Sequence, residues 1–538
     1  MRSGTKVAVV GGVFVVLASG AGYGAYNVLG GTSGVGGAVP VRTGPPSAEE
    51  IDRTAKDFLA AWAEGDVNTA SGLTNNAAEA QPALATYRTD AHVSQVALTP
   101  GTPVGATVPF TVKAVVSYEG RTKPWTYESA LTVVRGVKTG KPLVDWVPTV
   151  VHPKLTTGLQ MKTGTASAPS LEAVDRDGKP LTREKYPSLG PVLDQLRTRY
   201  GELAGGGEPG VELWIDSVGE GSPDQTLLTL SEGKPAKLET TLDAGVQEAA
   251  ERAVKKYGES SVVAIEPSTG HVLGFANHRA DGYNAAFQGQ LAPGSTMKIV
   301  TAALYLDKGL MSYGGSAPCP KSAVWYGQTF RNLKGFEIPD ATFEQSFARS
   351  CNTAFIKPIA DDAIDDASLT DAADRFFGLG HEWSVGIPSF DGSVPVTGKQ
   401  DSAAAMIGQG KVLMSPLNMA SVTATVKTGR FDQPVIVAQS LDNRQLATAD
   451  GLKGSVARAL RRAMQLTAAS GTGAGPMAGV PSPKGAKTGS AEIDGNAQPN
   501  SWFTGYSGDL AAAAVVEKGG HGGDAAGPIV AAVLRAGN

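Results

Sequence analysis

The apolar and polar positions along the chain separate two N-terminal stretches from a long remainder. Residues 7–29 contain no charged side chain and are mostly apolar, and residues 30–47 are rich in Gly, Pro, Ser and Thr. An apolar stretch of about 20 residues can span a bilayer, whereas a Gly- and Pro-rich stretch behaves as a flexible connection. The pattern therefore predicts a membrane segment, then a flexible linker, and folded domains from residue 48 onward.

The apolar segment has two interpretations. Arg2 and Lys6 precede it, and basic residues before a span favour an N-terminus inside the cell. This predicts a cytoplasmic tail over residues 1–6 and an uncleaved anchor over residues 7–29. The alternative is a cleaved signal peptide, since small residues occur near Ala18-Ser19-Gly20. Both interpretations export the rest of the chain.

Residues 48–152 combine a helical pattern with alternating ones. Ser47 and Glu50 fit a capping box, and the helix that follows has one apolar face, made by Ile51, Ala55, Phe58, Leu59 and Trp62. Strands are predicted from alternation around residues 108–116, 125–134 and 143–147. The segment is expected to be a small α+β domain. It has no convincing acid–base pair, so we expect it to act as a spacer.

The pattern is patchier over residues 153–237, which we interpret as a linker unit, and becomes regular again from Leu238. An amphipathic helix is predicted to begin within residues 240–254, followed by strands at 261–266 and 271–276. The remainder, residues 238–538, is expected to be one large domain.

The net charge, the cysteine content and the motifs argue against several classes of function. The formal net charge of the 538-residue chain is −4, which argues against nucleic acid as a partner, because binding phosphates needs clustered cations. Two cysteines, Cys319 and Cys351, are too few for a Cys-based zinc site. The chain has no Gly-rich phosphate loop or His-Glu-x-x-His motif, and none of its six histidines has an evident triad setting. No metal or cofactor is predicted.

The first candidate for chemistry is Ser295 with Lys298 in Ala-Pro-Gly-Ser-Thr-Met-Lys. On a helix the two side chains lie on one face, and a lysine that has lost its proton can activate the serine oxygen. The Ser-x-x-Lys pattern also occurs at Ser3 and Ser231, so the pattern alone is weak. Ser295 differs because Pro293-Gly294 leads into a strong helix, whose N-terminus favours a developing oxyanion.

The second candidate is Ser350-Cys351-Asn352, whose serine lies 55 residues after Ser295. The Ser350 hydroxyl could relay a proton to a leaving amine. The amide of Asn352 offers both a donor and an acceptor. The alternative interpretation is an ordinary helix N-cap, since Ser and Asn favour such positions.

The third candidate is Lys487-Thr488-Gly489-Ser490. Lys-Thr-Gly also occurs at Lys138, Lys162 and Lys427. Only Lys487, however, opens a predicted strand inside the domain of Ser295. An edge strand with a cation, a hydroxyl and a glycine that permits close approach suits an anionic peptide.

The order of these three elements resembles that of the penicillin-recognising serine transferases, which include the penicillin-binding proteins and β-lactamases. The resemblance runs from about Leu238 to the C-terminus. It is strengthened by Thr240-Thr-Leu-Asp, Ile407-Gly-Gln-Gly, Met414-Ser-Pro-Leu and Asn500-Ser-Trp-Phe. Residues 58–66, Phe-Leu-Ala-Ala-Trp-Ala-Glu-Gly-Asp, resemble the NTF2-like domain of low-affinity penicillin-binding proteins. No glycosyltransferase domain is evident, as in the monofunctional, class B type.

The resemblance implies a multidomain α+β fold. An NTF2-like α+β cone over residues 48–152 would precede a small linker or dimerisation domain over 153–237. A transpeptidase domain over 238–538 would hold an antiparallel sheet flanked by a helical subdomain.

The same resemblance implies roles for the motif residues. Ser295 would be the nucleophile and Lys298 its base, with Ser350, Asn352 and Lys487 completing the catalytic set. Thr488, Gly489 and Ser490 would bind substrate, and the backbone N–H groups of Ser295 and Ser490 would form the oxyanion hole. Ser490 stands where threonine is more usual, which keeps the hydroxyl. Cys319 and Cys351 could form a disulfide if exported; two buried free thiols are the alternative.

The implied function is a D,D-transpeptidase that cross-links peptidoglycan stem peptides and is acylated by β-lactams. It would sit in the bacterial cytoplasmic membrane on a single N-terminal anchor, with partners among the proteins of wall-synthesis complexes. One rival is a β-lactamase or a pure carboxypeptidase, although no deacylation base is evident. The other is a binding module, either a β-lactam sensor or a scaffold.

Overall fold

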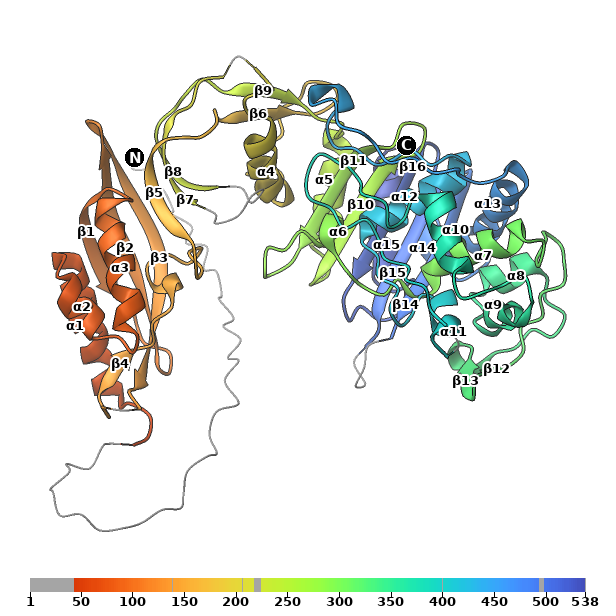
Figure 1. Cartoon of the computed structure of the whole chain (residues 1–538), viewed down its shortest axis with the longest axis horizontal. Helices are drawn as coiled ribbons and strands as arrows, with labels where there is room; N and C mark the ends of the chain where they lie inside the picture. The colour runs from red at the N-terminus through yellow and green to blue at the C-terminus, as the bar shows by residue number, and fades with distance from the viewer. Residues whose placement is uncertain are drawn as a thin grey trace, which may run out of the picture.

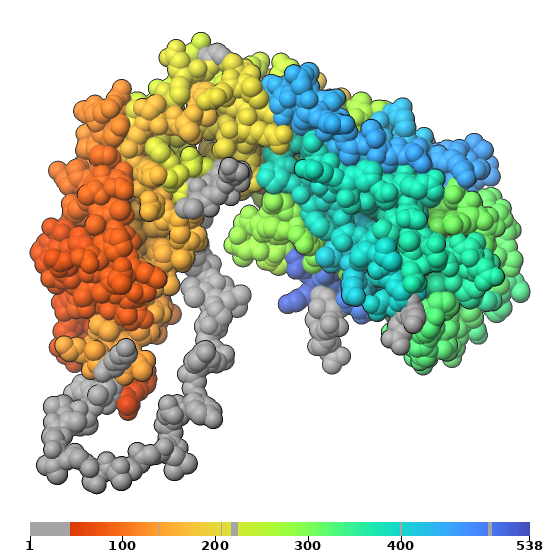
Figure 2. Space-filling view, viewed as in Figure 1, coloured from red at the N-terminus to blue at the C-terminus, as the bar shows by residue number. Residues whose placement is uncertain are grey.

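The computed structural model describes residues 43–137, 139–205, 207–216, 224–398, 400–492 and 498–537. The predicted tail, the apolar segment 7–29 and most of the linker 30–47 lie outside these ranges. Within them, no helix combines the length and the apolar character needed to cross a bilayer. Figures 1 and 2 show an N-terminal part in red and orange and a C-terminal part in green and blue, with residues of the yellow segment between them.

The N-terminal part packs three helices against an antiparallel sheet of order β1-β2-β3-β4. The helices are α1 (Ala48–Glu64), α2 (Val67–Gly72) and α3 (Ala77–Thr89), and the strands are β1 (Val93–Pro100), β2 (Thr107–Tyr118), β3 (Arg121–Arg135) and β4 (Pro142–Val144). The Ser47–Glu50 capping box is present, and Gly65 ends α1 in the left-handed conformation. The predicted apolar face of α1 is buried, and Trp62 contacts the rings of Phe58, Tyr87 and Phe110.

The middle of the chain forms two small sheets and one helix. The sheets have the orders β5-β7-β8 and β6-β9. The elements are β5 (Gln160–Thr165), β6 (Leu171–Val174), α4 (Gly190–Tyr200), β7 (Val211–Asp216), β8 (Gln225–Ser231) and β9 (Ala236–Glu239). Met161, Leu213 and Ile215 belong to the same core as Trp62. Leu196 and Leu238 belong to the core of the C-terminal part. The described apolar residues of this segment are therefore shared between its two neighbours.

The C-terminal part is built on a five-stranded antiparallel sheet of order β11-β10-β16-β15-β14. Its strands are β10 (Ser260–Glu266), β11 (His271–His278), β14 (Lys484–Ala491), β15 (Asn500–Ser507) and β16 (Leu510–Val516). Alternate residues face opposite sides of a strand. Val262 and Ala264 accordingly pack in one core with α5 (Ala244–Val254) and α15 (Ala526–Ala536). Val263 and Ile265 face the second core, which holds α7 (Lys298–Asp307) and α12 (Pro416–Thr428).

A helical layer covers that second face and surrounds the start of α7 (Figure 1). It includes α6 (Ala285–Gln288), α8 (Phe343–Ala348), α9 (Thr353–Ile356), α10 (Ser368–Phe377), α11 (Gln400–Met406) and α13 (Gly454–Ala469). The short helix α14 (Ala474–Met477) packs in the other core, with α15. A two-stranded hairpin, β12 (Ser322–Trp325) and β13 (Gln328–Arg331), projects from it. The expected antiparallel sheet with a helical subdomain is confirmed.

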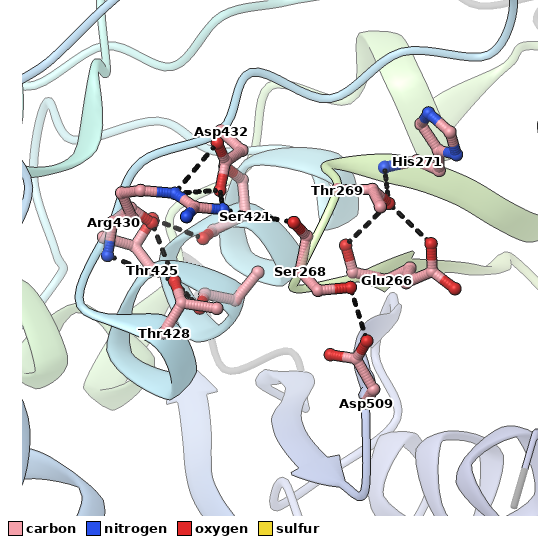
Figure 3. Close-up of polar contacts among 11 residues, drawn as sticks. Glu266, Ser268, Thr269, His271, Ser421, Thr425, Thr428, Arg430, Asp432 and Asp509 are labelled. Carbon is pink, nitrogen blue, oxygen red and sulfur yellow. Dashed lines mark hydrogen bonds and ion pairs between the residues drawn. The ribbon is translucent and has the colours of Figure 1, made fainter.

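One end of the sheet is closed by polar contacts around the β10–β11 turn (Figure 3). Ser268 donates to Asp509 in the β15–β16 turn at 2.5 Å, and Arg430, just after α12, donates to the Ser268 carbonyl at 3.1 Å. Arg430 also pairs with Asp432. The strand register puts this cluster at the opposite end of the strands from Ser490, which pairs with Ser501. It therefore ties turns together away from the candidate site.

Candidate active site

Ser295 lies in a short 3-10 turn, η3 (Gly294–Met297), that runs directly into α7. The turn needs glycine at 294, because φ is +53° and an added Cβ would lie 2.5 Å from the Ser490 carbonyl oxygen. This close approach brings the serine against β14. The prediction of a serine at a helix start is confirmed, with the difference that the α-helix itself begins at Lys298.

Lys298 is fully buried and its Nζ contacts four oxygens, of which Ser350 Oγ is the most distant at 3.5 Å. Its Nζ lies 3.0 Å from Ser295 Oγ, 2.8 Å from the Ser350 carbonyl oxygen and 2.6 Å from Asn352 Oδ1. The last two oxygens can only accept hydrogen bonds. A neutral amine that donates its two protons to them has one lone pair left, and that lone pair faces the serine hydroxyl.

Burial favours the neutral form of this amine. Desolvation, with a smaller contribution from the charge of Lys487, holds the pKa of Lys298 well below its usual range. Burial also lowers the pKa of Lys487 to about 7. The two lysines thus share a site in which a second positive charge is unfavourable.

The segment Ser350-Cys351-Asn352 forms the wall opposite β14. Ser350 has a left-handed backbone, with φ of +59°, and its hydroxyl accepts a hydrogen bond from Lys487 Nζ at 2.9 Å. Asn352 precedes α9, so it stands at the N-cap position that was the alternative interpretation. Its side chain makes no cap bond there. Its amide nitrogen donates to the Arg331 carbonyl at 2.9 Å, which turns Oδ1 toward Lys298.

The strand β14 is an edge of the sheet, as predicted, although it begins at Lys484 and not at Lys487. Thr488 Oγ1 lies 2.6 Å from Thr472 Oγ1. At Gly489 an added Cβ would lie 2.8 Å from the Pro293 carbonyl oxygen, so only glycine lets the strand pass this close to η3. Ser490 lies beside Gly489 and faces the same cleft.

A cleft of about 1200 Å³ is lined by Ser295, Ser350, Asn352, Thr488 and Ser490. The other described Ser-x-x-Lys and Lys-Thr-Gly matches do not line this cleft. Lys162 lies on β5 beside Asp216, Lys427 is on the last turn of α12, and Ser231 ends β8. Ser3 and Lys138 lie outside the described residues. In the part of the chain that the structure describes, no group of three or more His, Cys, Asp or Glu side chains could hold a metal ion.

The structure places Cys319 and Cys351 in a disulfide that closes 32 residues of sequence. Cys351 lies between Ser350 and Asn352, so the covalent bond holds the wall of the cleft against the segment before β12. The described chain contains no free cysteine.

Three further residues of the site had no motif to reveal them. Asn332 is buried and its Oδ1 accepts hydrogen bonds from the backbone N–H groups of Asn352 at 2.8 Å and Thr353 at 3.2 Å. Thr472 supports Thr488. His521 Nδ1 lies 3.3 Å from Ser490 Oγ, in a Gly-rich loop between β16 and α15. His521 contacts Ser490 and not Ser295, so this contact is not that of a base with the candidate nucleophile.

Together these contacts suit acyl transfer to serine, because they combine a half-buried hydroxyl, a buried amine 3.0 Å from it, and a second hydroxyl beside another buried amine. Comparison with known proteins identifies the class more closely. Residues 260–535 match the model of the penicillin binding protein transpeptidase domain, and residues 50–158 match the NTF2-like N-terminal transpeptidase domain. The chain belongs to the penicillin-binding protein transpeptidase family.

Relatives and solved structures agree with this assignment. The chain is 27% identical over 410 residues to peptidoglycan D,D-transpeptidase PbpA of Mycolicibacterium smegmatis, which covers 61% of this chain and 80% of the relative. The chain is also 26% identical to PbpA of Mycobacterium tuberculosis over 371 residues. This alignment covers 56% of this chain and 72% of the relative. Pseudomonas aeruginosa PBP2, solved in complex with WCK 5153, has a similar fold. Its TM-score is 0.54 at 21% identity, over 69% of this chain and 96% of that one.

Proposed function

We propose that the chain is a D,D-transpeptidase that cross-links peptidoglycan stem peptides through an acyl-Ser295 intermediate. The observation that carries this proposal is the contact set of Lys298. Two oxygens that can only accept take its protons and leave its lone pair for the Ser295 hydroxyl. The named D,D-transpeptidase relatives support the choice of reaction.

In the proposed acylation, Ser295 Oγ forms a bond to the carbonyl carbon of the penultimate D-Ala. Lys298 takes the hydroxyl proton. The C–N bond to the terminal D-Ala then breaks, and its amine receives a proton through Ser350, whose hydroxyl is held by Lys487. The amine of a second stem peptide attacks the acyl-enzyme and releases Ser295.

The remaining motif residues would bind the substrate and stabilise the oxyanion. Thr488 and Ser490 hold the terminal carboxylate, Gly489 admits the peptide backbone, and Asn352 contacts the acyl side. The backbone N–H groups of Ser295 and Ser490 stabilise the oxyanion. A β-lactam enters in the same way and remains attached to Ser295, because its ring opens without releasing a leaving group.

The location and the domain roles belong to the same proposal. Residues 7–29 would anchor the chain in the bacterial cytoplasmic membrane, and residues 48–152 would act as a spacer. Residues 153–237 would link it to a transpeptidase domain over 238–538 outside the cytoplasm. The apolar N-terminal sequence supports the anchor, and the disulfide supports an extracytoplasmic site. Partners would come from a wall-synthesis complex.

The test is covalent labelling with a fluorescent penicillin, followed by peptide mapping. We expect one adduct, on Ser295, that is absent in Ser295→Ala. The matched control is Ser231→Ala, which removes the serine of another Ser-x-x-Lys match and should label normally. Labelling of Ser295→Ala would refute the assignment. Steady rapid turnover of nitrocefin, in place of a single stoichiometric burst, would identify a β-lactamase instead.

A further inference from the structure

Three cations line the wall of the cleft that carries Asn352. Arg331 ends β13, Lys334 follows it in a turn, and Arg349 directly precedes Ser350. All three side chains are exposed, and all three residues line the cleft that contains Ser295. They form a local concentration of positive charge on a chain whose net charge is −4.

These cations have no acidic partner within the described ranges of the chain. No ion pair joins Arg331, Lys334 or Arg349 to a carboxylate there. The acids that line the same cleft, Glu492 and Asp524, come from the sheet side. Unpaired cations that converge on a cleft raise the local concentration of anionic ligands.

The backbone holds these side chains in place. The Arg331 carbonyl oxygen accepts a hydrogen bond from the Asn352 side-chain amide at 2.9 Å. The Arg331 side chain therefore starts next to the wall of the cleft that carries Asn352. Lys334 has a left-handed backbone, with φ of +56°, a conformation that costs energy for a residue with a side chain. The Arg349 guanidinium lies 5.6 Å from the centre of the Phe336 ring, which joins it to the turn of Lys334.

We propose that Arg331, Lys334 and Arg349 form an anion subsite that selects donor peptides with a free side-chain carboxylate on the acyl side of the scissile bond. The inference rests on the proposed function, in which Thr488 and Ser490 hold the terminal carboxylate and Asn352 faces the acyl side. The three cations lie on the side of Asn352. They therefore meet a second carboxylate, separate from the one at the end of the peptide.

Two penicillins provide a matched pair of probes: benzylpenicillin and carbenicillin, which differ by one carboxylate on the acyl side chain. The measured quantity is the ratio of their acylation rate constants on Ser295. In wild type, the ratio of carbenicillin to benzylpenicillin should fall as salt rises, because exposed charges are screened. Replacing all three cations, Arg331→Gln, Lys334→Gln and Arg349→Gln together, should lower the ratio by about five- to tenfold.

Single variants and a control variant distinguish loss of the subsite from misfolding. Each single substitution should lower the ratio by about twofold, and Arg331→Gln keeps the carbonyl that binds Asn352. Lys256→Gln removes an exposed lysine after α5, away from the cleft, and should leave the ratio unchanged. The same comparison with two synthetic peptides that end in D-Ala-D-Ala, one with the acyl-side carboxylate and one with its amide, should favour the carboxylate.

The outcomes separate this inference from the proposed function. A ratio that is independent of salt and equal in wild type and all cation variants overturns the anion subsite, while Ser295 is still acylated. Labelling that survives Ser295→Ala overturns the function itself.

Discussion

Replacing Asn332 by alanine tests whether a residue outside all motifs holds the wall of the cleft that Ser350, Cys351 and Asn352 form. Asn332 is 4% exposed and bonds on both sides of its amide. Its oxygen accepts hydrogen bonds from the backbone N–H groups of Asn352 and Thr353. Its nitrogen donates to the carbonyls of Pro320 and Phe336, both at 2.9 Å. The truncation leaves these buried groups without that partner.

The cost can be worked from those contacts. Each orphaned buried group costs about 1–3 kcal/mol, and Thr353 Oγ1 still donates to the Pro320 carbonyl at 2.7 Å, which reduces the sum. Three of the four groups lose their partner outright, so we expect a loss of about 3 kcal/mol or more in the free energy of unfolding. At about 2 °C per kcal/mol for a domain of this size, the melting temperature should fall by roughly 5 °C or more.

Acylation should suffer as well, because Asn352 supplies one of the two oxygens that orient Lys298. A misplacement worth about 1.4 kcal/mol slows the reaction roughly tenfold. The assay is the acylation rate constant with a fluorescent penicillin, measured below the melting temperature of the variant. Thr329→Ala, an exposed change on the strand β13 that precedes Asn332, is the control. If Asn332→Ala melts and acylates like Thr329→Ala, the positioning role is wrong.

Three further predictions concern the lysines and the disulfide. In the proposed mechanism acylation needs neutral Lys298, and the charge of Lys487 helps to lower the pKa of Lys298. Lys487→Met should therefore move the acid limb of the pH–rate profile to higher pH, and an unmoved limb contradicts this coupling. Because the pKa of Lys487 is lowered from 10.5 to about 7, the folded state binds fewer protons than the unfolded state between these values. The free energy of unfolding should rise with pH across that window, less steeply in Lys487→Met. The disulfide closes 32 residues, which corresponds to about 4 kcal/mol of unfolded-state entropy. A reductant should lower the melting temperature of wild type but not that of the double variant Cys319→Ser, Cys351→Ser, and equal responses would refute the bond.

Helical geometry alone predicted the local part of the site. The distant motifs were brought together only through the family resemblance, and the tertiary partners that no motif marks were missed. Ser295 and Lys298 lie three residues apart on one turn, so their contact follows from helical geometry alone. The predicted start of β14 is three residues late, because Lys484-Gly485-Ala486 has no apolar alternation to mark the start of a strand. The Ala-rich helix α3 likewise had no distinctive periodicity.

Asn332 could not have been found in this way. Its importance comes from meeting Asn352, which is 20 residues further along the chain, and a lone Asn after a short strand carries no signal. The same holds for His521, which reaches Ser490 only because its loop folds back across the sheet. Their partners are fixed by packing and not by spacing.

The middle segment has a mechanical consequence. Its chain crosses between the two cores three times: from β5 to β6, from α4 to β7, and from β8 to β9. Arg197 on α4 clamps these crossings, since it pairs with Glu212 on β7 at 2.9 Å and donates to the carbonyls of Ala168 and Pro169. A single peptide tether would bend and twist freely, whereas three fastened strands resist both motions. We therefore expect the segment to limit bending and twisting between the two cores, so that a displacement of one core is passed to the other.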